Sequence, residues 1–179
     1  MLERIAQHWP AWLAATISYP LAGIAGRLVA GPATAWTSAL LAGAVAGLVV
    51  GGAQALAMSP RRPDLRWPAV TAVGAAIGLA VSVTLGFAPL PTGLLMGALI
   101  GIGQASVAFA GSSVATRAIV AWPAVIAAAW ALGWSVTTAI GVDPAAGWAV
   151  FGLSGALTSQ IVSLAGAFAV AGRPARVAA

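Results

Sequence analysis

The chain has 179 residues, of which 61% are hydrophobic and only 6% are charged, whereas a soluble domain carries about 25% charged residues. So few charges cannot cover a surface that faces water, and the mean hydropathy of +0.99 indicates an integral membrane protein instead. The net charge of +5 comes from arginines in short loops beside apolar segments, which favours membrane topology over nucleic-acid binding, and the lack of cysteine excludes disulfides and thiolate metal sites.

Six apolar segments follow one another along the chain, and each is long enough to cross a membrane. We predict spanning helices over residues 9–30, 36–58, 68–88, 92–110, 118–140 and 147–170. About 20 residues at 1.5 Å each extend roughly 30 Å, which is the thickness of the hydrocarbon layer. The segments between them are rich in Gly, Pro, Ser and Asp, residues typical of turns. The sequence therefore predicts one all-α membrane domain over residues 1–179.

The first segment has a competing interpretation as a cleaved signal peptide, because a basic N-terminus and an apolar run precede Ala33-Thr34-Ala35. Tyr19-Pro20 interrupts that run, however, and Arg27 lies before the supposed cleavage site. The segment also carries one copy of an internal repeat. We therefore expect it to be a retained spanning helix.

The arginines are divided unequally between the two ends of the predicted helices. With six spans, seven of them fall on one side of the membrane: Arg4, Arg61, Arg62, Arg66, Arg117, Arg173 and Arg176. Arg27 lies near the opposite side, where Asp143 could pair with it. Because basic residues concentrate on the cytoplasmic side, both termini are predicted to be cytoplasmic.

A repeat relates the six segments. The tripeptide Trp-Pro-Ala occurs at residues 9–11, 67–69 and 122–124. Each copy is expected to open an odd-numbered helix, since Pro suits the first helical position and Trp suits the membrane interface. The even-numbered helices carry stripes at i, i+4, i+8 and i+11, positions that share one helix face. These stripes are Gly43, Gly47, Gly51 and Gln54; Gly93, Gly97, Gly101 and Gln104; and Gly147, Phe151, Gly155 and Thr158.

The repeating unit is a helical hairpin, present at about 9–58, 67–110 and 122–170. Two spans make one unit, so the three units share one orientation in the membrane. The sequence therefore predicts three parallel helical hairpins arranged about a pseudo-threefold axis along the membrane normal.

The stripes Gly47-Gly51-Gln54 and Gly97-Gly101-Gln104 each fit the pattern GxxxGxxQ. With the Trp that begins the following helix, they resemble a group of small bacterial multi-pass membrane proteins with GxxxGxxQ helical-hairpin repeats. The likeness covers nearly the whole chain, although the third repeat has Phe151 and Thr158 in place of Gly and Gln, and the second has a single Arg after its Gln. The resemblance implies the repeat fold and a bacterial inner (plasma) membrane, and it implies no activity.

Small residues let helix backbones approach closely in lipid, so the stripes are predicted to be helix contacts. A Gln side chain that faces lipid would leave its hydrogen-bonding groups unmet, so the glutamines are expected to face protein. The predicted packing residues and polar layer are Gly47, Gly51, Gln54, Gly97, Gly101, Gln104, Gly155 and Thr158. Two arrangements stay open: the polar members meet near the axis, or each ties its own hairpin to a neighbour.

Trp130 and Trp134 are spaced i, i+4 in the fifth segment and share one helix face. They are interpreted either as ordinary packing within the bundle or as a face that contacts a partner, a lipid or a carotenoid. Residues suited to catalysis are scarce, since the three acids and the single histidine fall in tails or loops. No metal-ligand cluster, carboxylate pair or Ser–His pair is evident in the sequence, so neither a metal nor an enzymatic activity is expected.

Three functions fit these observations. The first is a non-catalytic subunit or scaffold of a larger membrane assembly, in contact with membrane lipids and other membrane protein subunits. The second is a small channel or transporter for a neutral solute, with Gln54, Gln104 and Thr158 at its constriction. The third is a binder of an apolar cofactor such as a carotenoid or quinone, although the sequence requires none. We favour the first, because packing motifs are abundant while charges at depth, which proton or ion coupling needs, are missing.

Overall fold

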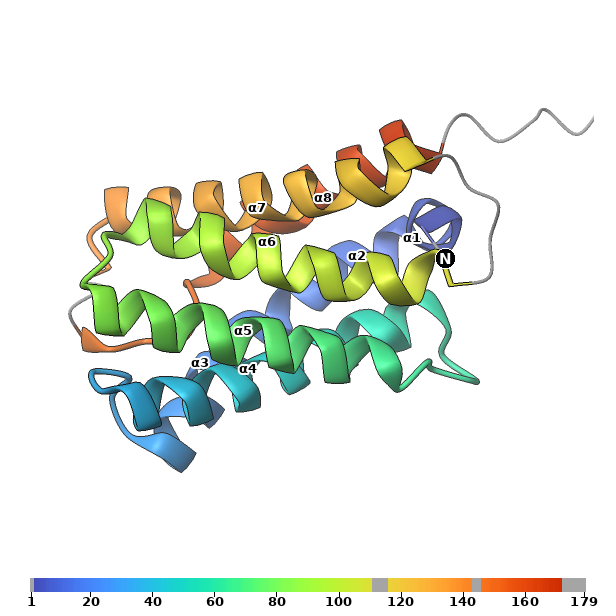
Figure 1. Cartoon of the computed structure of the whole chain (residues 1–179). Coiled ribbons are helices and arrows are strands. Elements are labelled where there is room, and N and C mark those ends of the chain that lie inside the picture. Colours follow the sequence, from blue (N-terminus) through green and yellow to red (C-terminus); the bar gives the residue numbers. More distant parts are fainter. Residues whose placement is uncertain (1, 111–115, 143–145, 172–179) are drawn as a thin grey trace, which may run out of the picture.

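The computed structural model contains helices and no strands in the part of the chain that it describes, residues 2–110, 116–142 and 146–171 (Figure 1). Its elements are α1 (Leu2–Gln7), α2 (Trp9–Ala14), the 3-10 turn η1 (Ala15–Ile17), α3 (Ser18–Ala30), α4 (Trp36–Met58), α5 (Arg66–Leu85), α6 (Pro89–Ala108), α7 (Thr116–Ala139) and α8 (Leu153–Ala171). Six helical stretches of the described residues are long and apolar enough to cross a membrane, with α2, η1 and α3 forming one of them. The prediction of an all-helical protein with six such helices is therefore confirmed.

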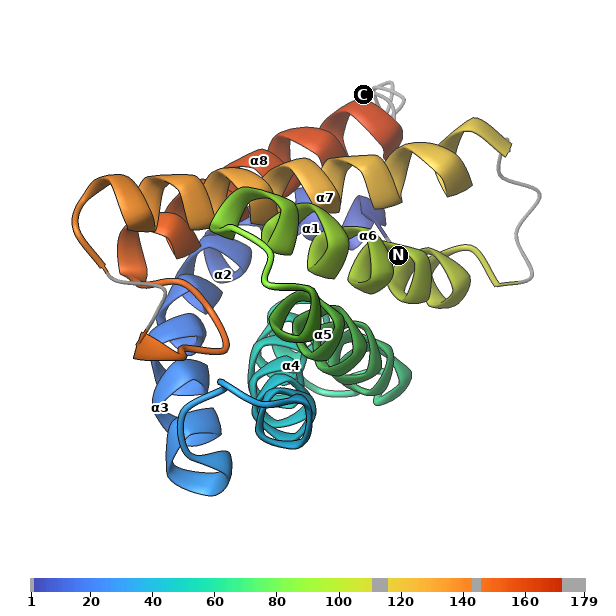
Figure 2. The ribbon, with the colours of Figure 1, turned by 60° about the vertical axis from the view of Figure 1, so that its left-hand side comes forward.

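The six spans lie side by side and close into a ring (Figures 1 and 2). Each span packs against the next one along the chain, and α8 returns to pack against α1, α2 and η1. The most extensive contacts join α4 to α5 and α6 to α7. Alanine and glycine make up much of the buried surface of α4, α5 and α6, which lets these backbones approach closely.

The first span is broken into three helical pieces where a single helix over residues 9–30 is predicted. Proline lacks the backbone N–H, and its ring crowds the carbonyl four residues earlier, which for Pro20 is that of Thr16. The 3-10 turn η1 lies at this carbonyl, and Ser18 Oγ donates to the Ala15 oxygen there at 2.7 Å. Pro20 thus accounts for the change from α-helix to 3-10 turn.

The last span begins later than predicted, because residues 146–152 are not α-helical. Gly147 has a φ of +70°, in the left-handed region that favours glycine, and its carbonyl accepts a hydrogen bond from the Ala33 N–H at 2.9 Å. Val150 and Phe151 are buried, so this irregular segment is covered by protein, as non-helical backbone at membrane depth must be. Gly147 and Phe151 therefore precede α8, and the prediction that places them on its stripe is wrong.

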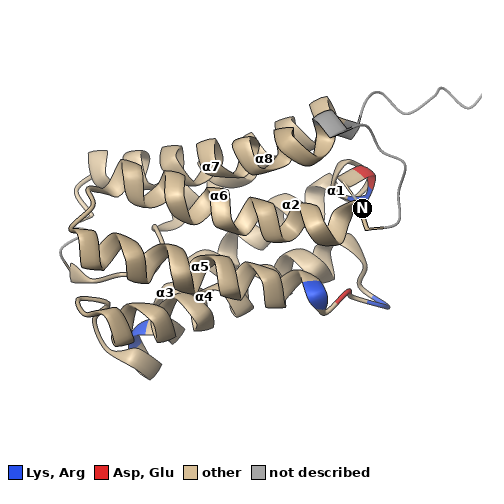
Figure 3. Ribbon diagram, in the orientation of Figure 1, with Lys and Arg blue, Asp and Glu red and all other residues tan. Residues whose placement is uncertain are grey.

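Among the described residues, the charged ones lie at the two ends of the bundle (Figure 3). One end of the bundle contains α1 and the loop between α4 and α5, and we call it the arginine end. Arg27, in the last turn of α3, lies at the opposite end, which we call the far end. In the loop, Asp64 accepts hydrogen bonds from the Arg66 N–H at 3.0 Å and from its guanidinium at 2.7 Å. The guanidinium hydrogen bond lowers the pKa of the Asp64 carboxyl below its ordinary value.

Candidate functional site, a buried glutamine centre

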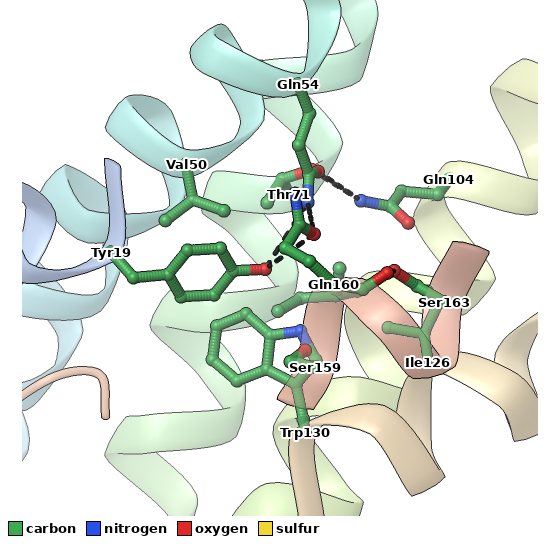
Figure 4. Close-up of a pocket in the computed structure, with 11 residues that line it drawn as sticks. Tyr19, Val50, Gln54, Thr71, Gln104, Ile126, Trp130, Ser159, Gln160 and Ser163 are labelled. Carbon is green, nitrogen blue, oxygen red and sulfur yellow. Dashed lines mark hydrogen bonds between the residues drawn. The ribbon is translucent and has the colours of Figure 1, made fainter. Parts of the chain in front are cut away.

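Three amide side chains meet in the interior of the helix ring (Figure 4). Gln54 of α4, Gln104 of α6 and Gln160 of α8 are all buried. Gln54 Nε2 donates to Gln160 Oε1 at 3.2 Å, and Gln104 Nε2 donates to Gln54 Oε1 at 3.5 Å. Three alternate spans are thus joined by side chains that carry no charge. We call these three residues the glutamine centre.

Gln54 is the most fully bonded member of the glutamine centre. Its Oε1 accepts from the Trp67 indole N–H at 3.1 Å as well as from Gln104. Its Nε2 donates to the Tyr19 hydroxyl at 3.4 Å as well as to Gln160. An amide group offers two acceptor and two donor positions, so every position of Gln54 is used. The indole can only donate, and this fixes the amide with its oxygen toward Trp67.

Gln104 is held by the same kind of contact one repeat further along the chain. Its Oε1 accepts from the Trp122 indole N–H at 3.2 Å, which again fixes the orientation of the amide. Its Nε2 donates to Thr71 Oγ1 at 3.1 Å in addition to Gln54. Both glutamines therefore bond to the tryptophan of the odd-numbered span that follows them, so the hydrogen bonds cross from one predicted hairpin to the next.

Gln160 joins the last span to the first, but it bonds to the backbone of a tryptophan rather than to its indole. Its Nε2 donates to the backbone oxygen of Trp12 at 2.6 Å, and its Oε1 also accepts from the Tyr19 hydroxyl at 3.4 Å. The Trp12 indole N–H donates instead to Ser163 Oγ of α8, at 3.2 Å. The last span is therefore bonded to the first one, and the polar contacts return to their starting point.

Thr158, the residue predicted for this position, is not part of the glutamine centre. Its Oγ1 donates to the carbonyl of Ser154 in its own helix, at 3.0 Å. The predicted stripe differs from the other two here, because Gly155 faces α7, the preceding span, whereas Gly51 and Gly101 face the span that follows. The sequence does contain a signal for the third member, because Gln160 is the only glutamine of the last span.

The three tryptophans that bond to the centre are Trp12, Trp67 and Trp122, and each is 0% exposed. The Trp-Pro-Ala motif predicts Trp9 as the first member, but Trp9 is 50% exposed and Trp12 takes its place. Trp12, Trp67 and Trp122 are spaced by a constant 55 residues. This spacing is the sequence signal for the buried tryptophans, and the Trp-Pro-Ala motif points to Trp9 instead. The motif also does not open every odd-numbered helix, because Pro123 lies inside α7.

The predicted packing glycines lie at helix contacts: Gly47 and Gly51 against α5, Gly97 and Gly101 against α7, and Gly155 against α7. A Cβ added at Gly51 would lie 2.7 Å from Pro68 Cα, and one added at Gly101 would lie 2.6 Å from Pro123 Cα. These distances are shorter than carbon atoms tolerate, so a larger residue would have to push the backbones apart. The glycines thus bring α4 to α5 and α6 to α7 closely enough for the Gln–Trp hydrogen bonds.

Trp130 and Trp134 are each 3% exposed and lie inside the ring, so the interpretation as an outward face for a partner or lipid does not hold. Both indoles contact the Phe151 ring edge-on, with centroid distances of 5.1 and 5.9 Å. Tyr19 stacks on the other side of this cluster, 5.2 Å from Phe151. The irregular segment before α8 therefore supplies the ring that covers the two tryptophans, and Tyr19 joins the aromatic cluster to the glutamine centre.

The free space at the glutamine centre is about 10 Å³, bordered among others by Tyr19, Trp130 and the three glutamines. A volume of this size holds about one water molecule. It leaves no room for a solute of several heavy atoms or for the ring of a cofactor. With its amide groups paired inside the protein, the centre is suited to linking helices rather than to binding a ligand.

The indole hydrogen bonds give a prediction with a matched control. Trp67→Phe removes the donor to the buried Gln54 oxygen, and we expect it to lower the free energy of unfolding by about 1–2 kcal/mol. Trp134→Phe makes the same chemical change at a buried indole whose N–H has no partner among the described residues, and it should change stability by less than about 0.5 kcal/mol. Chemical denaturation in detergent micelles measures both, and equal losses would show that the Gln54–Trp67 hydrogen bond does not stabilise the fold.

These features define a class of protein: in the residues that the structure describes, an all-helical bundle with six helical stretches suited to crossing a membrane and a polar cluster in its interior. No group of three or more metal-binding side chains occurs in the described residues. No protein-family model, curated protein or solved structure matches the chain. The resemblance to the GxxxGxxQ proteins therefore stays a prediction, and the proposed function depends on the geometry of this chain alone.

Proposed function

We propose that the protein is a non-catalytic membrane subunit that acts as a scaffold within a larger membrane protein assembly. The observation that carries this proposal is the closed interior. The three buried glutamines bond to one another and to neighbouring spans, and they enclose only about 10 Å³. A conduit for a neutral solute would need unpaired polar groups along an open path. A bundle whose central amide groups are paired inside the protein instead leaves the outer surface as the part that interacts.

The proposal includes the threefold arrangement of three parallel hairpins. It is supported by the Gln–Trp contacts, which join the first hairpin to the second through Gln54 and Trp67, and the second to the third through Gln104 and Trp122. The bond from Trp12 to Ser163 joins the third to the first. Each contact links the second span of one hairpin to the first span of another, as a ring of equivalent units requires.

The experiment that tests the scaffold proposal is purification from native membranes in a mild detergent, followed by cross-linking and mass spectrometry. We expect the 17.5 kDa chain to elute in a larger complex with one or more membrane proteins at fixed stoichiometry. A multi-pass protein of similar size, tagged and expressed at the same level, serves as the control for adventitious capture. Elution of the chain alone, with only lipid and detergent bound, would contradict the proposal.

The proposed orientation has both termini in the cytoplasm and the chain in a bacterial inner membrane, and it gives a labelling prediction. Ala88 is exposed at the far end between α5 and α6, and Ser59 lies at the arginine end. Because the chain has no cysteine, single Cys substitutions report without background. Ala88→Cys should react with an impermeant maleimide in intact cells, and Ser59→Cys should react only after permeabilisation. The reverse pattern would invert the orientation.

A further inference from the structure

An apolar groove of about 280 Å³ lies between α3 and the irregular segment that precedes α8. Its lining includes Pro20, Gly23 and Ile24 from α3 and Val150 and Phe151 from the segment. The groove exists because α3 and α8 make few contacts with each other, so the first and last spans are joined mainly near the arginine end. Among the described residues, the ring of helices is therefore open here toward its surroundings, which for a membrane protein are lipid chains.

The guanidinium of Arg27 lies at one end of this groove. Arg27 follows Gly23 by four residues and therefore lies on the same face of α3, one turn closer to the far end. Its guanidinium lies over the ring of Trp148, 5.0 Å from the centroid, and Trp148 is also part of the groove wall. One guanidinium nitrogen donates to the Ala146 carbonyl. No carboxylate of the described residues lies within ion-pair distance of Arg27, and Asp143, the partner predicted from the sequence, lies outside the described residues.

The dimensions of the groove match part of a lipid chain. Seven residues separate Pro20 from Arg27, which corresponds to about 10 Å along a helix. This length and the apolar lining suit part of one acyl chain, and the cation at the membrane interface suits the phosphate to which such a chain is attached.

We propose that this groove binds an anionic phospholipid, with the phosphate at the Arg27 guanidinium and one acyl chain along α3 toward Pro20. Trp148 keeps the guanidinium in place through the cation–π contact, and its indole also closes the side of the groove. With the orientation given under the proposed function, the lipid belongs to the outer leaflet. Binding itself does not depend on that orientation or on a partner subunit.

The charge of the site is tested with the purified full chain by native mass spectrometry. Phosphatidylglycerol and phosphatidylcholine are titrated separately, and the affinity of the first bound lipid is measured. Arg27→Gln should weaken phosphatidylglycerol binding about tenfold, because a charge-assisted contact to the phosphate is lost, and should change phosphatidylcholine binding less. Arg62→Gln removes the same charge at the arginine end and should have no effect on the first lipid. Equal affinities of Arg27→Gln and the parent chain would overturn the proposal.

The apolar part is tested by filling the groove. A Cβ at Gly23 would meet the Trp148 and Val150 side chains at 3.4 and 3.5 Å, which are ordinary contacts, so the helix accepts a side chain there. Gly23→Leu should weaken binding of both lipids at least fivefold with the melting temperature retained. Gly52→Leu is the control, since nothing lies within 4 Å of its Cβ position. If Gly23→Leu binds lipid as the parent chain does, this groove is not the lipid site. That outcome is independent of whether the chain purifies within a larger assembly.

Discussion

Gly97→Leu is expected to prevent the chain from reaching its native fold in detergent or lipid. A Cβ at this position would collide with the Ile126 carbonyl oxygen and would lie 2.7 Å from Ala127 Cα. Both are backbone atoms of α7, so no side-chain rotation relieves the clash, and α6 and α7 must separate. We expect a loss of more than about 4 kcal/mol, which is a large part of the roughly 5–15 kcal/mol by which folded domains are stable. Size-exclusion chromatography and limited proteolysis of the purified variant measure the loss.

The matched control for this change lies on α4. Gly52→Leu introduces the same side chain into a helical glycine whose Cβ position has no atom within 4 Å. It should change the free energy of unfolding by less than about 1 kcal/mol, since the new side chain faces lipid and leaves the helix contacts intact. If Gly97→Leu and Gly52→Leu behave alike, close helix approach is not what holds α6 against α7.

Gln54→Leu is expected to cause the second largest loss, about 2–3 kcal/mol. The amide makes four hydrogen bonds to buried groups, and its removal leaves the Trp67 N–H without an acceptor and the Gln104 and Gln160 amides with one partner fewer. Leucine itself is well suited to an apolar interior, so the loss measures the hydrogen bonds rather than a cavity. Thermal and chemical denaturation in micelles provide the measurement.

Gln7→Leu is the control for this prediction, because Gln7 is exposed and lies in α1 at the arginine end. The same chemical change there should leave stability within about 0.5 kcal/mol of the parent. A Gln54→Leu variant as stable as Gln7→Leu would mean that the glutamine centre contributes no more than a surface amide. That result would remove the structural role assigned to the centre.

The parts of the fold that depend on local pattern are visible in the sequence. The 23-residue α4 has the predicted bounds, because its apolar run ends at turn residues on both sides. The i, i+4, i+8, i+11 spacing likewise places Gly51 and Gln54 on one face, and Gly101 and Gln104 on another. Both pairs lie where that spacing puts them, against the helix that follows.

The parts that depend on tertiary contacts are not visible in the same way. Residues 146–152 leave the helical path because Gly147 adopts a positive φ while bonded to Ala33, more than 100 residues away. Gly147 and Phe151 therefore lie outside α8, and Gln160 rather than Thr158 joins the glutamine centre. Trp9 and Trp12 both lie in α2, and it is the packing of α2 against α8 that buries Trp12 and leaves Trp9 exposed.

The most direct test of a scaffold with a closed interior is a flux measurement. Purified protein is reconstituted into proteoliposomes, and glycerol permeation is followed by stopped-flow light scattering for the parent chain and for Gln104→Leu. If the glutamine centre links helices, both samples should match protein-free liposomes, and Gln104→Leu should only lose about 1–2 kcal/mol of stability, since Gln104 makes three hydrogen bonds where Gln54 makes four. Glycerol flux above that of protein-free liposomes, altered in a folded Gln104→Leu variant, would contradict the scaffold and identify the centre as the constriction of a channel.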